Sequence, residues 1–450
     1  MAGNILAAVR QIKAKVAEHL QPAAIERLCR ELNYVWRERL LGPVATVHAF
    51  LLQVLHGNVA CDAVPHLMQA SFTGDAYIQA RLRLPLELFQ RLLALVVESL
   101  AECRSAGERW CGHRVWLLDG SSCSMPDTPA LQQAFGQPGG QRKGCGFPVA
   151  HLLTLFHAGT GLLQKVLVAP LRTHDLKQAW QLHPELAAGD LLLADRGFCS
   201  YAHLAQLRAA GLHAVLRIHQ RVIVSFRQGR WHVPPSPPFP KRKGVRGLPR
   251  SAWIKRLGPC DQLVEWFKPK QRPVWLDAEA FAALPASLVV RELRYRIQQP
   301  GYRTREVLLV TTLLDAQAYP AEKLAELYAD RWQVELNLRH LKQTLRLDVL
   351  RCKTVAGVHK ELLMIALAYN LVRLVMLRAA EQQRVSVHRI SFIDALRWLC
   401  HVQQGDSLCR LIVRVQRPGR HEPRVRKRRP KEYSLMKQPR ATLRQALYEQ

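Results

Sequence analysis

The stretch YADRWQVELNLRHLK, Tyr328 to Lys342, places four polar side chains on one side of a predicted helix. Tyr328, Arg331, Glu335 and Lys342 follow the pattern Y-x2-R-x3-E-x6-K. At about 100° per residue they fall within roughly 60° of one another around the helix axis. A carboxylate beside an arginine, a lysine and a tyrosine is suited to hold a divalent metal ion next to a phosphate. The alternative is an ordinary solvated face of an amphipathic helix, and this stretch alone leaves both interpretations open.

The same helix also has an apolar side, which predicts how it is buried. Its leucines and its valine cluster on the side adjacent to the polar stripe, and this pattern is typical of a helix that packs on a core while one edge remains open to solvent. These residues are Leu327, Val334, Leu338, Leu341 and Leu345.

Two upstream segments each predict a buried strand that ends in an aspartate. RVWLLDGSS, from Arg114 to Ser122, is expected to deliver Asp119 at the end of a strand, followed by a Gly-Ser turn. GDLLLADRGFCSY, from Gly189 to Tyr201, is expected to do the same for Asp195. The carboxyl ends of strands are where open α/β sheets place their sites. An aspartate at a strand end is more often a turn former, so the functional interpretation depends on finding both aspartates upstream of Glu335.

With these three acids and the helical signature, the chain resembles the DDE transposases of bacterial insertion sequences, in the family of insertion sequence four. The resemblance covers about Val115 to Leu377 and includes DGS, DRGF and the complete Y-R-E-K signature. It implies three catalytic, metal-binding acids, which are Asp119, Asp195 and Glu335. It also implies a phosphate-binding set, which is Tyr328, Arg331 and Lys342.

Three carboxylates in one pocket repel one another unless cations share the site. Two Mg²⁺ or Mn²⁺ ions, about 3.5–4 Å apart, would neutralise them and support an in-line displacement at phosphorus. Asp119 is the expected bridging ligand. Arg331 is expected to clamp a phosphate with its planar fork, and Lys342 to act as a point charge. Trp332 either stacks on an unpaired base or packs in the core, and the sequence does not decide between them.

The fold class expected is α/β, a ribonuclease H-like core with a β-rich insertion and a helical N-terminal domain. Helical periodicity fills residues 1–110, with helices expected over Ile5–Leu20, Ala23–Arg39 and Pro43–Leu55. The turn at Gly57 permits either a helix-turn-helix that reads DNA or an ordinary helical bundle. The core is expected in residues 111–220 and 316–410, the insertion in 221–315 and a basic tail in 411–450. Within the insertion, VIVSF is expected to form a strand and Lys241–Arg250 a basic loop. The strands and helices expected in the core follow the order Val115–Leu118, Val149–Phe156, Leu163–Val168, helix Asp175–Leu182, Leu191–Ala194, helix Tyr201–Ala210 and Ala214–Ile218.

Composition independently favours a polyanionic partner. Lys and Arg number 65 against 35 for Asp and Glu, so the formal net charge is +30. This excess indicates a polyanionic partner, and the family resemblance implies that the partner is double-stranded DNA. The sequence shows no signal peptide, and its longest apolar stretch, Glu361 to Leu377, contains Asn370 and Arg373 and is shorter than the ~20 residues of a membrane span. We therefore expect a buried helix there, and no membrane partner.

The 11 cysteines are scattered without a C-x2-C pair, which fits a reducing, cytoplasmic location and gives no zinc motif. The family resemblance implies a homodimer that pairs two transposon inverted repeats and joins their 3′-hydroxyls to target DNA. Two alternatives stay open: a DNA-binding protein that has lost catalysis, and a metal-dependent nuclease of the same fold that cuts without joining.

Overall fold

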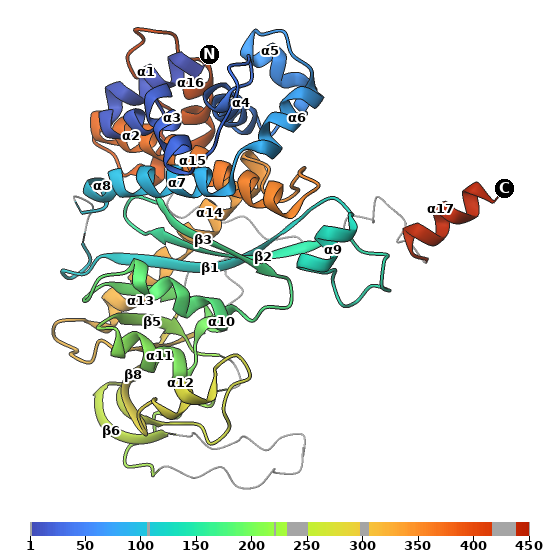
Figure 1. Ribbon diagram of the computed structural model, residues 1–450. Coiled ribbons are helices and arrows are strands. Elements are labelled where there is room, and N and C mark those ends of the chain that lie inside the picture. Colours follow the sequence, from blue (N-terminus) through green and yellow to red (C-terminus); the bar gives the residue numbers. More distant parts are fainter. Residues whose placement is uncertain are drawn as a thin grey trace.

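The computed structural model describes residues 2–105, 109–219, 222–231, 251–297, 306–415 and 438–449. One nine-stranded sheet runs through the middle of the molecule, in the order β3-β2-β1-β4-β5-β9-β8-β7-β6. The N-terminal helices and the long helix α15 cover one face at the β3 end of the sheet (Figure 1). The fold class is therefore α/β with a large mixed sheet.

The first five strands build the half of the sheet that carries the predicted acids. Strands β1, β2 and β3 are antiparallel neighbours, whereas β4 and β5 run parallel to β1. This is the strand order expected from the sequence; β4 has the expected ends, and the other four strands differ by one to six residues at one or both ends. The strands are β1 Val115–Ser124, β2 Val149–His157, β3 Leu163–Pro170, β4 Leu191–Ala194 and β5 His213–Arg217.

Strand β1 differs most from its prediction, because it continues six residues beyond Leu118. The expected Gly-Ser turn does not form. Pairing with β2 extends without a break from Trp116 opposite His157 to Ser124 opposite Val149, and these ladder hydrogen bonds keep Gly120 extended. Asp119 therefore lies within a strand rather than at the end of one.

Short helices cover the second face of the sheet. Helix α10 (Asp175–Ala179) continues as a 3-10 helix, η2 (Trp180–Glu185), where the sequence predicts one α-helix to Leu182. Pro184 lies inside η2, where it lacks the backbone N–H of an α-helix and disfavours the α conformation of the residue before it. After β4 come the 3-10 helix η3 (Arg196–Phe198) and α11 (Tyr201–Ala209). Leu118 and Ala194 pack with these helices in one apolar cluster.

The β-rich segment continues the same sheet. Strand β9 (Glu306–Thr311) pairs antiparallel with β5, and β8 (Ser287–Arg296), β7 (Asp261–Phe267) and β6 (Ser251–Gly258) follow outward. The short helix α12 (Ala278–Ala282) lies between β7 and β8. The expected strand VIVSF, residues 222–226, is irregular, and its first two residues are exposed. The basic loop expected at 241–250 lies outside the described residues.

The first hundred residues are helical, although the helices are shorter than the periodicity indicates. The segment predicted as one helix from Ile5 to Leu20 divides at Lys13, whose backbone is extended. The segment after Gly57 forms a 3-10 turn and a five-residue helix, which favours a bundle over a helix-turn-helix for this pair. The elements are α1 Ala2–Ile12, α2 Ala14–His19, α3 Pro22–Glu31, α4 Pro43–Leu55, η1 Cys61–Ala63, α5 Val64–Met68, α6 Gly74–Arg83, α7 Leu86–Ser99 and α8 Ala101–Ser105.

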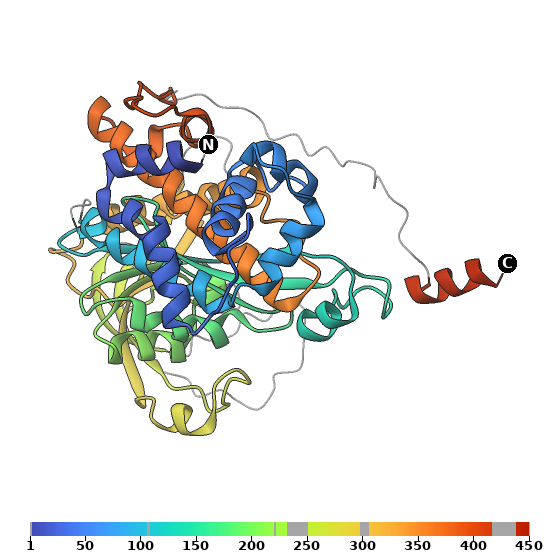
Figure 2. The ribbon, with the colours of Figure 1, turned by 45° about the horizontal axis from the view of Figure 1, so that its top comes forward.

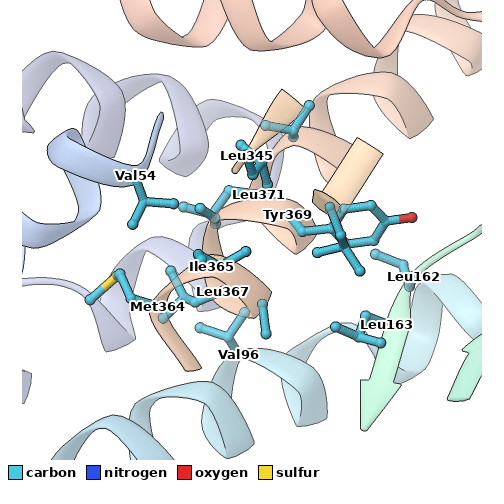
Figure 3. Packing of buried hydrophobic residues seen from close by; sticks show 14 of the residues in the cluster. Val54, Val96, Leu162, Leu163, Leu345, Met364, Ile365, Leu367, Tyr369 and Leu371 are labelled. Carbon is cyan, nitrogen blue, oxygen red and sulfur yellow. The ribbon is translucent and has the colours of Figure 1, made fainter. Parts of the chain in front are cut away.

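Helix α15 (Val355–Gln383) is the centre of the core on this side of the sheet. It is long and apolar enough to cross a membrane by composition, but 83% of its most apolar window is buried inside the protein. It packs against α4, α7 and β3, as the residues in Figure 3 show. The apolar stretch from Glu361 to Leu377 is thus a core helix, as expected.

The remaining helices complete the C-terminal part. Helices α13 (Ala321–Asp330) and α14 (Trp332–Arg339) and a π-helical turn, η4 (His340–Thr344), lead from the sheet to α15. The 3-10 helix η5 (Val387–Arg389) and α16 (Phe392–His401) follow it. Helix α17 (Arg440–Tyr448) lies apart from the rest in both views (Figures 1 and 2). Residues 416–437, which hold most of the expected basic tail, are outside the described part.

Candidate active site

The register of β1 and β4 brings the two aspartates to one edge. The last residue pair of this parallel ladder is Leu118 opposite Ala194. Asp119 is the next residue of β1, and Asp195 is the residue that directly follows β4, so the two aspartates lie side by side at the end of this ladder. Strand β4 ends at Ala194, whereas β1 continues. From Asp119 to Ser122, the described part of the chain gives β1 a strand partner only on its β2 side. The free edge of β1 forms one wall of an open cavity.

Hydrogen bonds fix the backbone around both aspartates. The Gly120 N–H donates to Asp119 Oδ1 at 2.8 Å, and the Thr154 hydroxyl donates to the Asp119 carbonyl oxygen at 3.0 Å. Asp195 begins the turn of η3, and its carbonyl oxygen accepts from the Phe198 N–H at 3.0 Å. The Tyr328 hydroxyl donates to Asp195 Oδ1 at 3.4 Å, which joins the helical signature to the second aspartate.

Glu335 is connected to Asp119 by the guanidinium of Arg331, which contacts both carboxylates. The signature does not form one continuous α-helix, because α13 ends at Asp330 and α14 begins at Trp332, with Arg331 at the junction. Arg331 Nη2 donates to Glu335 Oε1 at 3.1 Å, and Nη1 lies 3.9 Å from Asp119 Oδ2. The Arg331 Nε atom is buried and has no hydrogen-bond partner in the described part of the chain. Arg331 therefore lies between two of the predicted acids.

The electrostatics of the site show that the acids influence one another. Burial raises the pKa of Asp119 to about 6, the positive charge of Arg331 opposes this shift, and Glu335 and Asp195 add to it. Burial alone would lower the pKa of Arg331, but Tyr328 and the acidic side chains reverse this effect and raise it. The negative charges of Glu335 and Asp195 thus act on Asp119, and the Arg331 guanidinium is the positive charge that balances these carboxylates.

The open cavity beside β1 has a volume of about 400 Å³. Asp119 and Asp195 both line it, whereas Arg331 and Glu335 do not. Two further polar side chains face it that the sequence reasoning missed, His151 on β2 and Asp175 at the start of α10. An aspartate that begins a helix is commonly a capping residue, so nothing local marks Asp175 as part of the site. The remaining lining residues are Gly120, Ser121, Ser122, Leu171, Gly197 and Phe198.

The donor set is consistent with a hard divalent cation, although the acids are not gathered around one point. Among the residues that the structure describes, no three His, Cys, Asp or Glu side chains are close enough to hold one metal ion. Asp119, Asp195 and Glu335 offer only carboxylate oxygens, which suit Mg²⁺ or Mn²⁺. Their charges are instead shared by Arg331, so binding of a cation requires the guanidinium to give up these contacts.

Trp332 and Lys342 are the remaining residues that the sequence predicts to contact DNA. Trp332 is 42% exposed, so it is not the core tryptophan that the sequence left as an alternative. Lys342 is half-buried in the π-helical turn, which alters its expected direction around the helix. Its charge acts on Cys123, four residues beyond Asp119 on β1. Its backbone is joined to the end of β1 through Asp348, whose N–H donates to the Lys342 carbonyl oxygen and whose carbonyl oxygen accepts from the Ser124 N–H.

Comparisons with known proteins agree with this geometry. The family model described as "Transposase DDE domain" matches residues 110–371, which include all three acids and the helical signature. Transposase InsG of insertion sequence element IS4 from Escherichia coli K12 is 26% identical, over 94% of each chain. The transposase of IS231F from Bacillus thuringiensis subsp. israelensis is 21% identical, over 76% of this chain and 74% of the relative.

Among solved structures, a piggyBac transposase synaptic complex with hairpin DNA covers 88% of this chain and 77% of its own, with 10% identity and a TM-score of 0.43. Because the family model spans more than half of the chain and contains the acids that surround Arg331, the protein belongs to the DDE transposases, in the type of insertion sequence IS4.

Proposed function

We propose that Asp119, Asp195 and Glu335 are the catalytic acids of this transposase, which cuts transposon ends and joins the freed 3′-hydroxyls to target DNA on a ribonuclease H-like core. The observation that carries the assignment is the β1–β4 register, since it places two acids from distant segments at adjacent strand positions. The contact of Arg331 with both Glu335 and Asp119 supports the third assignment.

Two Mg²⁺ or Mn²⁺ ions held by these acids would activate the attacking oxygen and stabilise the leaving oxygen. Asp119 suits the bridging position, because it interacts with both other acids. Asp195 and Glu335 would each hold one of the two ions. The Tyr328 hydroxyl, which donates to Asp195, would keep that carboxylate directed toward the cavity.

Arg331 has a second partner in this proposal, a DNA phosphate. Its Nε is buried and unpaired among the described residues, and a planar guanidinium can donate two parallel hydrogen bonds to phosphate oxygens. Lys342 would hold a neighbouring phosphate as a point charge. Trp332 is exposed beside Arg331 and would stack on an unpaired base near the cleaved end.

The reaction runs as two displacements at phosphorus. In the first, a water oxygen bonds to the phosphorus at the transposon end, the bond to the 3′-oxygen breaks, and that oxygen leaves as a 3′-hydroxyl. In the second, this hydroxyl bonds to a target phosphorus, its proton is lost, and the target 3′-oxygen leaves. The side chains of this chain bind and orient the two phosphates.

The partners in this proposal are double-stranded DNA and a second copy of the chain. A formal charge of +30 supports a polyanionic partner. Contacts with DNA would come from the helical residues 1–110, from the insertion at 221–315 and from the tail that begins at 411. A cytoplasmic location is part of the proposal. All 11 cysteines are free, as a reducing compartment requires.

The test compares Asp119→Ala, Asp195→Ala and Glu335→Ala in gel-shift and cleavage assays on the element's own end DNA. Cleavage should be lost while DNA binding persists. Glu322→Gln, an exposed acid of α13, is the matched control and should cleave normally. Near wild-type cleavage by any of the three alanine variants would overturn the assignment. Joining of a pre-cut end to target DNA separates a transposase from a plain nuclease, which would give no joined product.

A further inference from the structure

His151 and Asp175 form a close pair that lines the cavity. His151 Nε2 lies 2.5 Å from Asp175 Oδ1, in a direction unsuited to a good hydrogen bond. The histidine side chain is 15% exposed and the aspartate side chain 36%, so the imidazole is largely enclosed and the carboxylate faces the opening. The two residues come from different elements, β2 and α10, and the pair joins them beneath the active-site edge of β1.

The missing side chain at Gly120 lets this carboxylate approach the segment that carries Asp119 closely, and the carboxylate also contacts the segment that carries Asp195, near Gly197. A Cβ at Gly120, the residue after Asp119, would lie 3.2 Å from Asp175 Oδ1 and equally close to the His151 ring. A Cβ at Gly197, two residues after Asp195, would lie 3.7 Å from Asp175 Oδ2. The carboxylate of Asp175 therefore lies between the two segments, with one oxygen toward each.

Asp175 reaches this position from the face of the sheet opposite to Glu335. Leu176 packs with Leu118 and Ala194 on the second face, whereas Val334 of α14 packs with Leu117 on the first. The cavity opens past the end of β4, so side chains from both faces can meet there. Three aspartates thus line the cavity, whereas Glu335 does not and is connected to Asp119 through Arg331.

We propose that Asp175 is a fourth acidic group of the cation site, positioned by His151. The inference rests on the proposed function, since it assigns a further residue to the same site. Asp175 Oδ2 has no hydrogen-bond partner among the described residues and is free to accept a cation or one of its bound waters. Its negative charge also adds to the field that attracts a divalent ion. Groups that act beside the direct ligands typically change metal affinity by about 10–100-fold.

A second ion pair on the same part of the fold provides a matched control. Glu185 of η2 pairs with Lys165 of β3 at 2.8 Å, and it does not line the cavity. Both acids belong to the segment between β3 and β4, and both pair with a residue of the β2–β3 hairpin. Replacing either acid by its amide removes one negative charge with little change of volume. Only Asp175 is expected to affect cation binding.

The experiment measures Mn²⁺ binding to the full chain by calorimetry without DNA, for Asp175→Asn and Glu185→Gln. Asp175→Asn should weaken Mn²⁺ binding by about 10-fold, whereas Glu185→Gln should bind as the wild type. End cleavage should need a correspondingly higher Mg²⁺ concentration for half-maximal rate, and the rate at saturating Mg²⁺ should approach that of the wild type. A merely structural role would lower that saturating rate and leave Mn²⁺ affinity unchanged, which would overturn the proposal.

Two further variants separate the possible failures. If Asp175→Asn does not fold, Asp175→Glu keeps the charge but displaces the oxygens, and unchanged Mn²⁺ affinity in that variant overturns the inference. His151→Gln keeps Asp175 and removes its imidazole partner, so the Mn²⁺ affinity of this variant should lie between those of the wild type and Asp175→Asn. If Asp119→Ala loses Mn²⁺ binding and Asp175→Asn does not, only this inference fails. If Asp119→Ala binds Mn²⁺ and cleaves DNA as the wild type does, the proposed function itself is wrong.

Discussion

Arg331 is hydrogen-bonded to Glu335, the acid that follows it by one helical turn, with Nη2 3.1 Å from Oε1. The same guanidinium lies close to Asp119, so it provides the counter-charge that these carboxylates need when no cation is bound. A cation and the guanidinium therefore compete for the same oxygens. In our proposal Arg331 has two opposing roles: it competes with a cation for the carboxylates in the free protein, and it binds phosphate in the DNA complex.

This competition predicts opposite effects for Arg331→Ala. Mn²⁺ binding without DNA should become stronger, because the carboxylates lose their competing partner. End cleavage should fall by about 10–100-fold, since a hydrogen bond to a charged group contributes about 1.5–3 kcal/mol. Arg331→Lys should recover little cleavage, because an ammonium cannot form the planar fork. Arg339→Ala, an exposed arginine of α14, is the control. Calorimetry and a cleavage time course test the prediction, and weaker Mn²⁺ binding by Arg331→Ala would contradict it.

Lys342 and Glu335 should have separate effects. The charge of Lys342 acts on Cys123 of β1, and Lys342 has no contact with the three acids among the described residues, so Lys342→Ala should weaken binding of end DNA and leave Mn²⁺ affinity unchanged. Losing one phosphate contact should reduce the log–log salt slope of DNA binding by about 0.9. Glu335→Ala should instead lose Mn²⁺ affinity while DNA remains bound. The exposed Lys323 of α13 serves as the control for Lys342. A Lys342→Ala variant that loses Mn²⁺ affinity as severely as Glu335→Ala would show that this division is wrong.

Asn370 should contribute strongly to stability, because its amide completes the edge strand of the sheet. It is fully buried on α15, its Oδ1 accepts from the Leu163 N–H at 2.9 Å, and its Nδ2 donates to the Leu163 carbonyl oxygen at 2.9 Å. Asn370→Leu leaves both backbone groups buried and unpaired, which should cost about 2–4 kcal/mol of the free energy of unfolding. Tyr369→Phe removes one bond, to the Gly161 carbonyl oxygen, and should cost about 1 kcal/mol. Urea unfolding measures the free energy of unfolding of both variants. Equal losses in Asn370→Leu and Tyr369→Phe would contradict the larger contribution assigned to Asn370.

The buried pair of His183 and His203 predicts acid sensitivity near the active site. His203 Nδ1 donates to the Phe198 carbonyl oxygen, so its Nε2 accepts from His183 Nε2 at 3.2 Å and both rings are neutral. Burial lowers the pKa of His203 to about 4 and that of His183 to about 3. Phe198 belongs to the turn after Asp195, so the pair supports that segment.

Because both pKa values lie below the ordinary value near 6.5, the unfolded chain takes up protons first as the pH falls. Stability should therefore be full above about pH 6.5 and decrease as the pH falls toward 4. His203→Gln should be less stable at neutral pH and show a smaller decrease over this window. Thermal unfolding at several pH values tests this. A slope identical to that of the wild type would mean that other groups cause the acid sensitivity.

Much of the site was predictable from residue pattern. Asp119, Asp195 and the helical signature were identified because strands with apolar runs and helices with a polar stripe depend on local periodicity, and β4 and α4 have the ends that periodicity predicts. The prediction was wrong where tertiary contacts decide. VIVSF has the composition of a strand but does not pair, and β1 continues through its Gly-Ser pair because β2 continues beside it.

The sequence by itself determined which groups are available: three acids, a cationic and aromatic signature, and a strongly basic chain. Only the tertiary structure decided how they meet. The pairing of Leu118 with Ala194, the position of Arg331 among the acids and the approach of Asp175 to Gly120 join residues far apart in the chain. Their positions depend on sheet register and on a missing side chain at residue 120. Such contacts follow from how the whole core packs, because no local propensity specifies them.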